Sequence, residues 1–107
     1  MARRKPTGRS VRHDRDRAQA EIVQDLERLA RLAPGGAPER PLPVASPAQV
    51  EAAAARQPCP LCDGNMRLEE HTAETVAGVR LRVARVICTS CAMRRAVYFR
   101  IGAPLLN

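Results

Sequence analysis

Aromatic residues are nearly absent from the sequence: its 107 residues include no Trp, one Tyr and one Phe. Aromatic side chains contribute most to buried apolar area, so a core of ordinary size is excluded. Domains below about 70 to 80 residues commonly compensate for a small core with disulfides or a metal ion. The four cysteines are the candidates for that role here.

Long apolar runs are also missing. No segment approaches the roughly 18 apolar residues that cross a bilayer. The basic N-terminus carries Pro6, Gly8 and Asp14 where a secretory signal peptide would need an apolar stretch. We therefore expect a cytoplasmic protein with no membrane partner, in reducing conditions that favour metal-bound cysteines over disulfides.

The chain has one Lys but is strongly basic, with a formal net charge of +7. Residues 1–17 carry seven basic and two acidic groups, which is +5 of that charge. Such a segment suits phosphate-rich or otherwise acidic partners. An arginine-rich composition with no bearing on binding explains the charge equally well. Residues 1–13 are polar and interrupted by Pro6 and Gly8, and we predict that they form a disordered basic arm.

A helical pattern follows, and residues 14–33 are predicted to form an amphipathic helix. Its apolar stripe consists of Ile22, Leu26, Leu29 and Ala33. A helix of this length is only marginally stable alone, so the stripe needs a partner. Docking onto the rest of the chain is the simpler expectation. Self-association is the alternative, but the apolar stripe spans fewer than two heptads, whereas a coiled coil needs three or four.

Two further segments lead to the cysteines. Residues 34–45 contain four Pro and two Gly, and we predict a linker that decouples the two halves of the chain. Residues 46–57 predict a short lead-in helix, because Ser46 and Gln49 have the spacing of a capping box and Pro47 stands at the first helical position.

The four cysteines form two pairs with the same spacing, Cys59 with Cys62 and Cys88 with Cys91. A tight turn at each pair directs both sulfurs to one point, and two such turns complete a tetrahedral shell for one structural Zn²⁺. A redox dithiol and an iron site with the same four-sulfur shell are the alternatives. Four thiolates leave no open position for a catalytic water, so we expect no enzyme. His71 is nine residues beyond Cys62, roughly 30 Å along a strand, and is not expected to be a ligand.

The segment between the two pairs is predicted to be a long hairpin with a three-residue loop, Val76–Gly78. That register opposes Thr75 to Val79, Glu74 to Arg80, Glu69 to Arg85 and Leu68 to Val86, and it brings both cysteine pairs to the base of the hairpin. The apolar residues of the two strands then lie on different faces, which indicates a bulge or a strong twist near Ala84. Residues 96–101 predict a third strand.

The run Cys59-Pro60-Leu61-Cys62-Asp63-Gly64 resembles the C-P-x-C-x-G first knuckle of zinc ribbons. The resemblance covers residues 58–101 and implies a structural zinc, bound by the four cysteines, on a three-stranded antiparallel sheet. The expected fold is thus a small zinc-stabilised β domain, residues 58–107, preceded by the two helices and the arm. Zinc ribbons serve many functions, so the resemblance fixes none.

Two functions remain open for a non-catalytic zinc protein with no small-molecule substrate. The first is binding of nucleic acid or a nucleoprotein through arginine-rich surfaces. The alternative is a protein-interaction adaptor whose partner helix uses Ile22, Leu26 and Leu29. The candidate nucleic-acid-binding residues are Arg3, Arg4, Lys5, Arg9, Arg12, Arg80, Arg82, Arg94 and Arg95.

Overall fold

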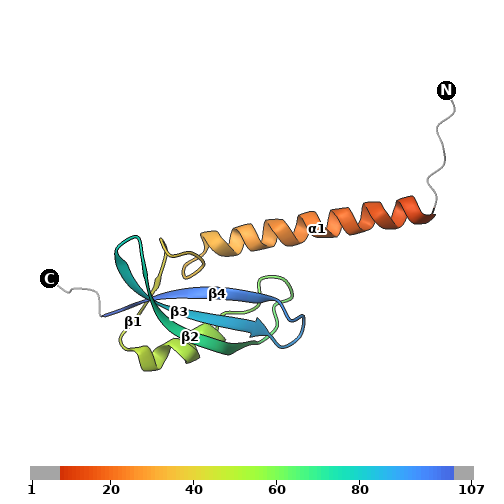
Figure 1. The fold of residues 1–107 in the computed structure, drawn as a ribbon. Coiled ribbons are helices and arrows are strands. Elements are labelled where there is room, and N and C mark those ends of the chain that lie inside the picture. Colours follow the sequence, from red (N-terminus) through yellow and green to blue (C-terminus); the bar gives the residue numbers. More distant parts are fainter. Residues whose placement is uncertain (1–7, 103–107) are drawn as a thin grey trace.

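A computed structural model describes residues 8–102, with side chains from residue 11. One long and one short helix accompany a four-stranded mixed sheet, whose strand order is β1-β4-β3-β2 (Figure 1). The elements in chain order are α1 (Gly8–Leu32), β1 (Leu42–Val44), a 3₁₀ turn (Pro47–Gln49), α2 (Val50–Ala55), β2 (Met66–Val76), β3 (Val79–Cys88) and β4 (Arg94–Ile101).

The core lies between α2 and one face of the sheet. Val50 and Ala54 of α2 are completely buried there, and Phe99 of β4 is the largest fully buried side chain. With a single large aromatic in it, this core stays small. The short helix therefore closes the sheet as well as leading to the first cysteine pair.

The β2–β3 hairpin has the predicted register at its base and a different one at its tip. Leu68 lies opposite Val86 as predicted, but the register shifts between Leu68 and Glu70, so that Glu70 rather than Glu69 faces Arg85. The irregularity predicted near Ala84 is thus a bulge on β2, where Glu69 is the extra residue opposite Arg85 and Val86. The shift puts Glu70 on the same face as Arg85, whose guanidinium also lies 2.9 Å from Glu74.

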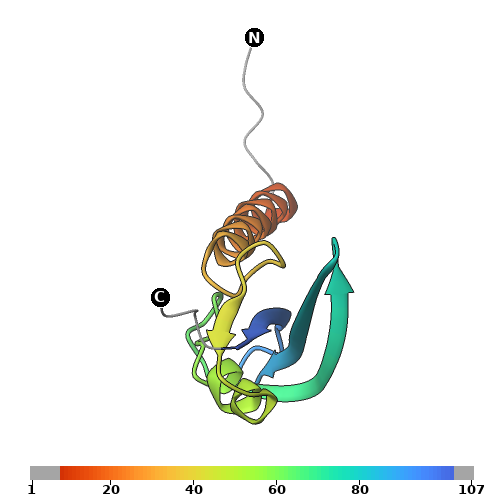
Figure 2. The same cartoon turned by 90° about the vertical axis from the view of Figure 1, so that its left-hand side faces the viewer.

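The hairpin loop contains two residues rather than the predicted three, because Val76 pairs with Val79. Ala77 and Gly78 both have positive φ, 50° and 80°, as a type I′ turn requires. Such a turn matches the right-handed twist of the strands. Figure 2 shows β2 bending strongly between the base of the sheet and this tip.

The predicted linker is wrong in part, because β1 lies within residues 34–45. β1 pairs in parallel with β4, so the sheet has four strands and is mixed, rather than three-stranded and antiparallel. The segment that leads into β1 first meets the sheet at Gly35, whose carbonyl accepts a hydrogen bond of 2.8 Å from Tyr98 N–H. Gly35 has a φ of 82°, and a Cβ there would lie 2.8 Å from Leu42. Gly35 was expected to be part of a flexible linker, but it holds the chain against the sheet.

Helix α1 begins at Gly8, six residues before the predicted start, so residues 8–13 are helical rather than part of a disordered arm. Residues 1–7 of that arm lie outside the described part of the chain. No Pro or Gly interrupts the sequence between Gly8 and Pro34, so nothing stops the helix earlier. No helix within residues 8–102 is long and apolar enough to cross a membrane.

The apolar stripe of α1 does not dock onto the sheet as expected. Ile22 is 58% exposed and Leu29 is 62% exposed. Figures 1 and 2 show α1 standing off the sheet, with its N-terminal half extending past the strands. The core cluster is already closed by α2, and within residues 8–102 Ile22 and Leu29 remain exposed, while Leu26 is partly buried.

Candidate metal centre

The first cysteine pair lies on a tight turn, the first knuckle, formed by residues 59–64. Cys59 N–H donates to the Gly64 carbonyl at 3.0 Å, and Asp63 N–H donates to the Cys59 carbonyl at 2.8 Å. Asp63 has a φ of 62°, which reverses the chain after the second cysteine. Short polar residues tolerate this left-handed conformation better than most.

The second pair lies on a turn of the same construction, the second knuckle, formed by residues 88–93. Cys88 N–H donates to the Met93 carbonyl at 2.8 Å, and Ala92 N–H donates to the Cys88 carbonyl at 3.0 Å. Ala92 has a φ of 63°, matching its counterpart in the first knuckle. The identical spacing of the two cysteine pairs thus encodes two copies of one turn.

The two knuckles bring all four sulfurs to within 4.8 Å of one another. Cys59 Sγ lies 3.6 Å from Cys91 Sγ, and Cys62 Sγ lies 3.4 Å from Cys88 Sγ. Zn–S bonds near 2.3 Å place the corners of a tetrahedron about 3.8 Å apart. None of the four is in a disulfide. The cluster can therefore hold one metal ion.

Backbone N–H groups donate hydrogen bonds to two of the sulfurs. Leu61 N–H donates to Cys59 Sγ at 3.4 Å, and Ser90 and Cys91 N–H donate to Cys88 Sγ at 3.4 and 3.5 Å. The bond from Cys91 is the largest cause lowering the pKa of Cys88 to about 6.

The opposite shift occurs at the neighbouring sulfur. The hydrogen bond with Cys88 raises the pKa of Cys62 to about 12. One thiolate therefore makes ionisation of the next unfavourable when no cation shares the site. A divalent ion removes this conflict by binding all the sulfurs as thiolates.

No protein-family model matches the chain, and no curated protein or solved structure matches it either. What this chain binds must therefore be inferred from the geometry and chemistry of its own residues.

Thr89 connects the second knuckle to the end of the first through hydrogen bonds that the sequence did not predict. Its N–H and its hydroxyl both donate to the Asn65 carbonyl, at 2.9 and 3.1 Å. Thr89, a polar residue inside the second C-x₂-C pair, and Asn65, which follows the first knuckle, carry this signal weakly. His71, by contrast, lies outside the cysteine cluster as predicted. Its Nε2 is buried and has no hydrogen-bond partner among the described residues.

The candidate nucleic-acid-binding arginines that the structure describes lie on different elements. Arg80 and Arg82 lie on one face of β3, and neither has a carboxylate within 4.0 Å among the described residues. Arg94 on β4 is already paired with Glu69 at 2.9 Å. Arg12 lies on α1, Arg9 is described only by its backbone, and Arg3, Arg4 and Lys5 lie outside the described residues.

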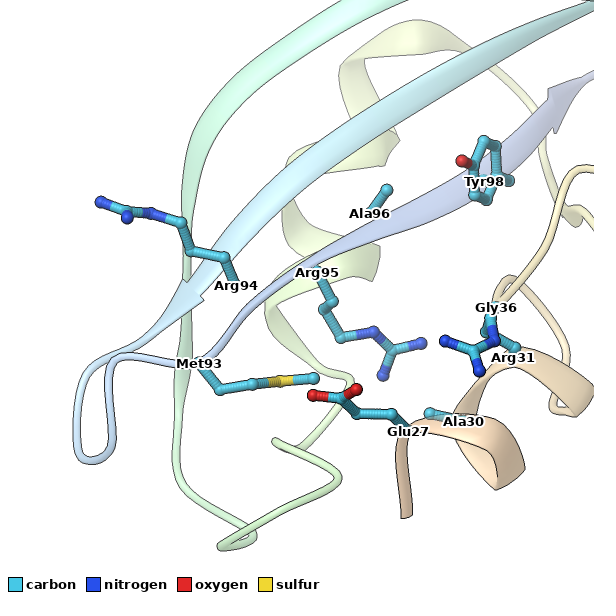
Figure 3. A pocket seen from close by; sticks show the side chains of 9 residues that line it. All are labelled: Glu27, Ala30, Arg31, Gly36, Met93, Arg94, Arg95, Ala96 and Tyr98. Carbon is cyan, nitrogen blue, oxygen red and sulfur yellow. The ribbon is translucent and has the colours of Figure 1, made fainter. Parts of the chain in front are cut away.

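Arg95 lines a pocket of about 270 Å³ between the end of α1 and the start of β4. Figure 3 shows its guanidinium facing that of Arg31, with the Glu27 carboxylate close by. Burial lowers the pKa of Arg95. Glu27 offsets one of these two positive charges, so Arg31, Arg95 and Glu27 together carry a net charge of +1.

Proposed function

We propose that this chain is a non-catalytic protein of the zinc-ribbon type that binds one structural Zn²⁺ through Cys59, Cys62, Cys88 and Cys91. The observation that carries the proposal is the grouping of four cysteine sulfurs within 4.8 Å of one another. All four positions of the shell are protein thiolates, so none remains for a reacting water. The ion stabilises the fold rather than performing chemistry.

Zinc is the proposed ion because it is not redox-active. Four thiolates are enough to bind it, and no surrounding residues are needed to set a reduction potential. Iron also accepts four thiolates. Two of the present ligands, Cys62 and Cys91, are exposed, however, and the chain has one Tyr and one Phe to shield a redox centre. Solvent exposure is one of the factors that set an iron site's potential. Metal analysis separates the two ions directly.

The zinc module then serves as a base from which α1 binds a protein partner, which makes the chain an interaction adaptor. This part of the proposal is supported by the exposure of Ile22, Leu29 and Leu32, each more than half exposed on one helix. An amphipathic helix presents its apolar side chains to a groove or to another helix when its own domain does not cover them.

A second candidate function is nucleic-acid binding, and Arg80 and Arg82 favour it. Both project from one face of β3, and no carboxylate neutralises either of them within the described chain. Two such guanidinium groups can hold backbone phosphates without reading sequence.

Metal content tests the first part of the proposal. Protein purified under reducing conditions should contain one zinc per chain, and chelation should abolish its β-sheet circular dichroism. A zinc content near zero, or iron in its place, would overturn the assignment.

Affinity capture from the native cell extract separates the two functions. Partners lost with the double substitution Ile22→Glu and Leu29→Glu, and resistant to nuclease, indicate the adaptor. Recovery that depends on nucleic acid and on Arg80 and Arg82 indicates the second candidate. If neither pair of substitutions changes what is recovered, both surfaces are excluded as binding sites.

A further inference from the structure

The apolar stripe of α1 has the same spacing in both directions from Ile22. Positions four, seven and eleven residues away on either side all lie on the same face of a helix with 3.6 residues per turn. On the C-terminal side these positions are Leu26, Leu29 and Ala33, and on the N-terminal side they are Ala18, Arg15 and Val11. A second copy of the helix running in the opposite direction about Ile22 would therefore set Ala18 against Leu26, the aliphatic part of Arg15 against Leu29, and Val11 against Ala33.

The early start of α1 removes the objection that the stripe is too short. The helix has 25 residues, and a pair centred on Ile22 would overlap over residues 12–32, which is three heptads, whereas the apolar stripe predicted from the sequence, residues 22–33, spans fewer than two. A two-helix pairing needs about this length to be sustained.

The charges of the helix favour the antiparallel direction. Residues 11–20 contain three Arg and two Asp, for a net +1, while residues 21–32 contain two Arg, two Glu and one Asp, for a net −1. Antiparallel pairing sets these halves against each other and opposes the helix macrodipoles favourably. Parallel pairing would set like halves together and place Arg15 directly against its own copy, which is destabilising.

The side of α1 that lines the pocket is offset from Ile22 and Leu29, although Leu26 of the stripe is partly buried as well. Glu27 and Ala30 line the pocket and are partly buried, and they lie roughly 80 to 140° around the helix from Ile22. Ile22 and Leu29 are exposed. A second helix can therefore contact the stripe while the pocket and the sheet stay as they are, with the two zinc modules at opposite ends.

We propose that α1 pairs with α1 of a second copy of this chain as an antiparallel two-helix dimer centred on Ile22. The proposal rests on the proposed function in one respect, namely that α1 is the partner-binding element, and it names the partner. Ile22 meets Ile22 of the partner subunit at the two-fold axis. Ala18 then lies opposite Leu26 of the partner subunit, and Arg15 lies near the negative end of the partner helix.

Cysteine cross-linking in the zinc-loaded full chain tests the direction of pairing. Ile22→Cys should form an inter-chain disulfide readily, because the two positions meet at the axis. Leu29→Cys should not, because its two copies would be about 21 Å apart along the helices at 1.5 Å per residue. The unsubstituted chain, with its four cysteines on zinc, gives the background. Cross-linking of both variants would indicate a parallel pair, and cross-linking of neither a monomer; either result overturns the proposal.

Sedimentation equilibrium of the zinc-loaded protein measures the association itself. Ile22→Glu places two carboxylates against each other at the axis and should weaken the dimer by about 100-fold. Val79→Glu is the matched control, because Val79 is 50% exposed at the hairpin tip, away from α1, and should leave association unchanged.

The proposed function and the dimer can fail separately. A zinc-loaded chain that is monomeric throughout, but still loses a nuclease-resistant partner with Ile22→Glu and Leu29→Glu, overturns the dimer and leaves the adaptor standing. A dimer that Ile22→Glu leaves unchanged places the contact elsewhere and overturns the proposal.

Discussion

Gly64 of the first knuckle lies against Ser90 of the second. A Cβ on Gly64 would fall 2.9 Å from Ser90 Oγ and 3.0 Å from Cys88 Sγ. A Cβ contact as short as that with Ser90 Oγ essentially does not occur, and the one with Cys88 Sγ is tighter than nine in ten real contacts. The glycine is therefore needed for the close approach of the two knuckles, and the metal ligands meet because it has no side chain.

Gly64→Ala should weaken metal binding while leaving the separate strands intact. The added methyl group pushes the second knuckle away, so the four sulfurs can no longer keep tetrahedral spacing. We expect a loss of at least about tenfold in zinc affinity, in the range seen when the surroundings of a metal site are disturbed. Competition with a chromophoric chelator measures it.

Gly78→Ala is the control for this prediction. Gly78 is at the hairpin tip, where a Cβ would meet nothing within 4 Å, although its φ is 80°. The substitution should cost about 1 kcal/mol of backbone strain and leave zinc affinity unchanged. Equal losses of zinc affinity in the two variants would show that the contact with Ser90 is not what matters.

Removing a ligand should have a larger effect than disturbing one. Cys62→Ser or Cys88→Ser leaves three thiolates, and metal binding in such modules contributes on the order of 10 kcal/mol of folding free energy. Each variant should lose its zinc and its β-sheet signal, as measured by elemental analysis and circular dichroism. A folded, zinc-loaded Cys88→Ser protein would contradict the four-ligand site.

The cysteine site was predictable from the sequence because the requirement for four converging sulfurs is strict. The same requirement fixed the base of the hairpin, where Leu68 and Val86 lie opposite each other as predicted. Farther from the cysteines the constraint disappears. The tip register was wrong by one residue, because a two-residue turn at Ala77 and Gly78 and an extra residue at Glu69 decide it locally.

Composition was a poor guide to the segments outside the cysteine module. Gly35 and the prolines of residues 34–45 were interpreted as a linker, but hydrogen bonds to β4 hold β1 there. Pairing of a three-residue strand depends on where β4 lies, which no local pattern records. Charge likewise suggested disorder up to residue 13, although the helix starts at Gly8. Arginine has a high helix propensity, so an arginine-rich segment exposed to solvent can still be helical.

His71→Leu should stabilise the protein. The buried Nε2 of His71 has no partner among the described residues, and an unsatisfied buried polar atom costs about 1 to 3 kcal/mol. We expect the free energy of unfolding of the zinc-loaded protein to rise by about 1 kcal/mol in urea titrations, with zinc content unchanged. His13→Leu, on an exposed part of α1, should change it by less than about 0.5 kcal/mol. Loss of stability or of zinc in His71→Leu would show that Nε2 contributes to folding or to metal binding.

Nucleic-acid binding, if Arg80 and Arg82 mediate it, should depend steeply on salt. Each phosphate neutralised contributes about 0.7 to 0.9 to the slope of log affinity against log salt. Arg80→Ala and Arg82→Ala should each lower that slope by about one unit, measured by fluorescence anisotropy with a single-stranded and a double-stranded oligonucleotide. Arg94→Ala is the matched control, since Glu69 already holds its guanidinium at 2.9 Å and it has less to offer a phosphate. With one Tyr and one Phe in the chain, base stacking is weak, so we expect little preference for sequence. No binding to either oligonucleotide at low salt, or an equal loss of slope in all three variants, would exclude this face of β3 as the binding surface.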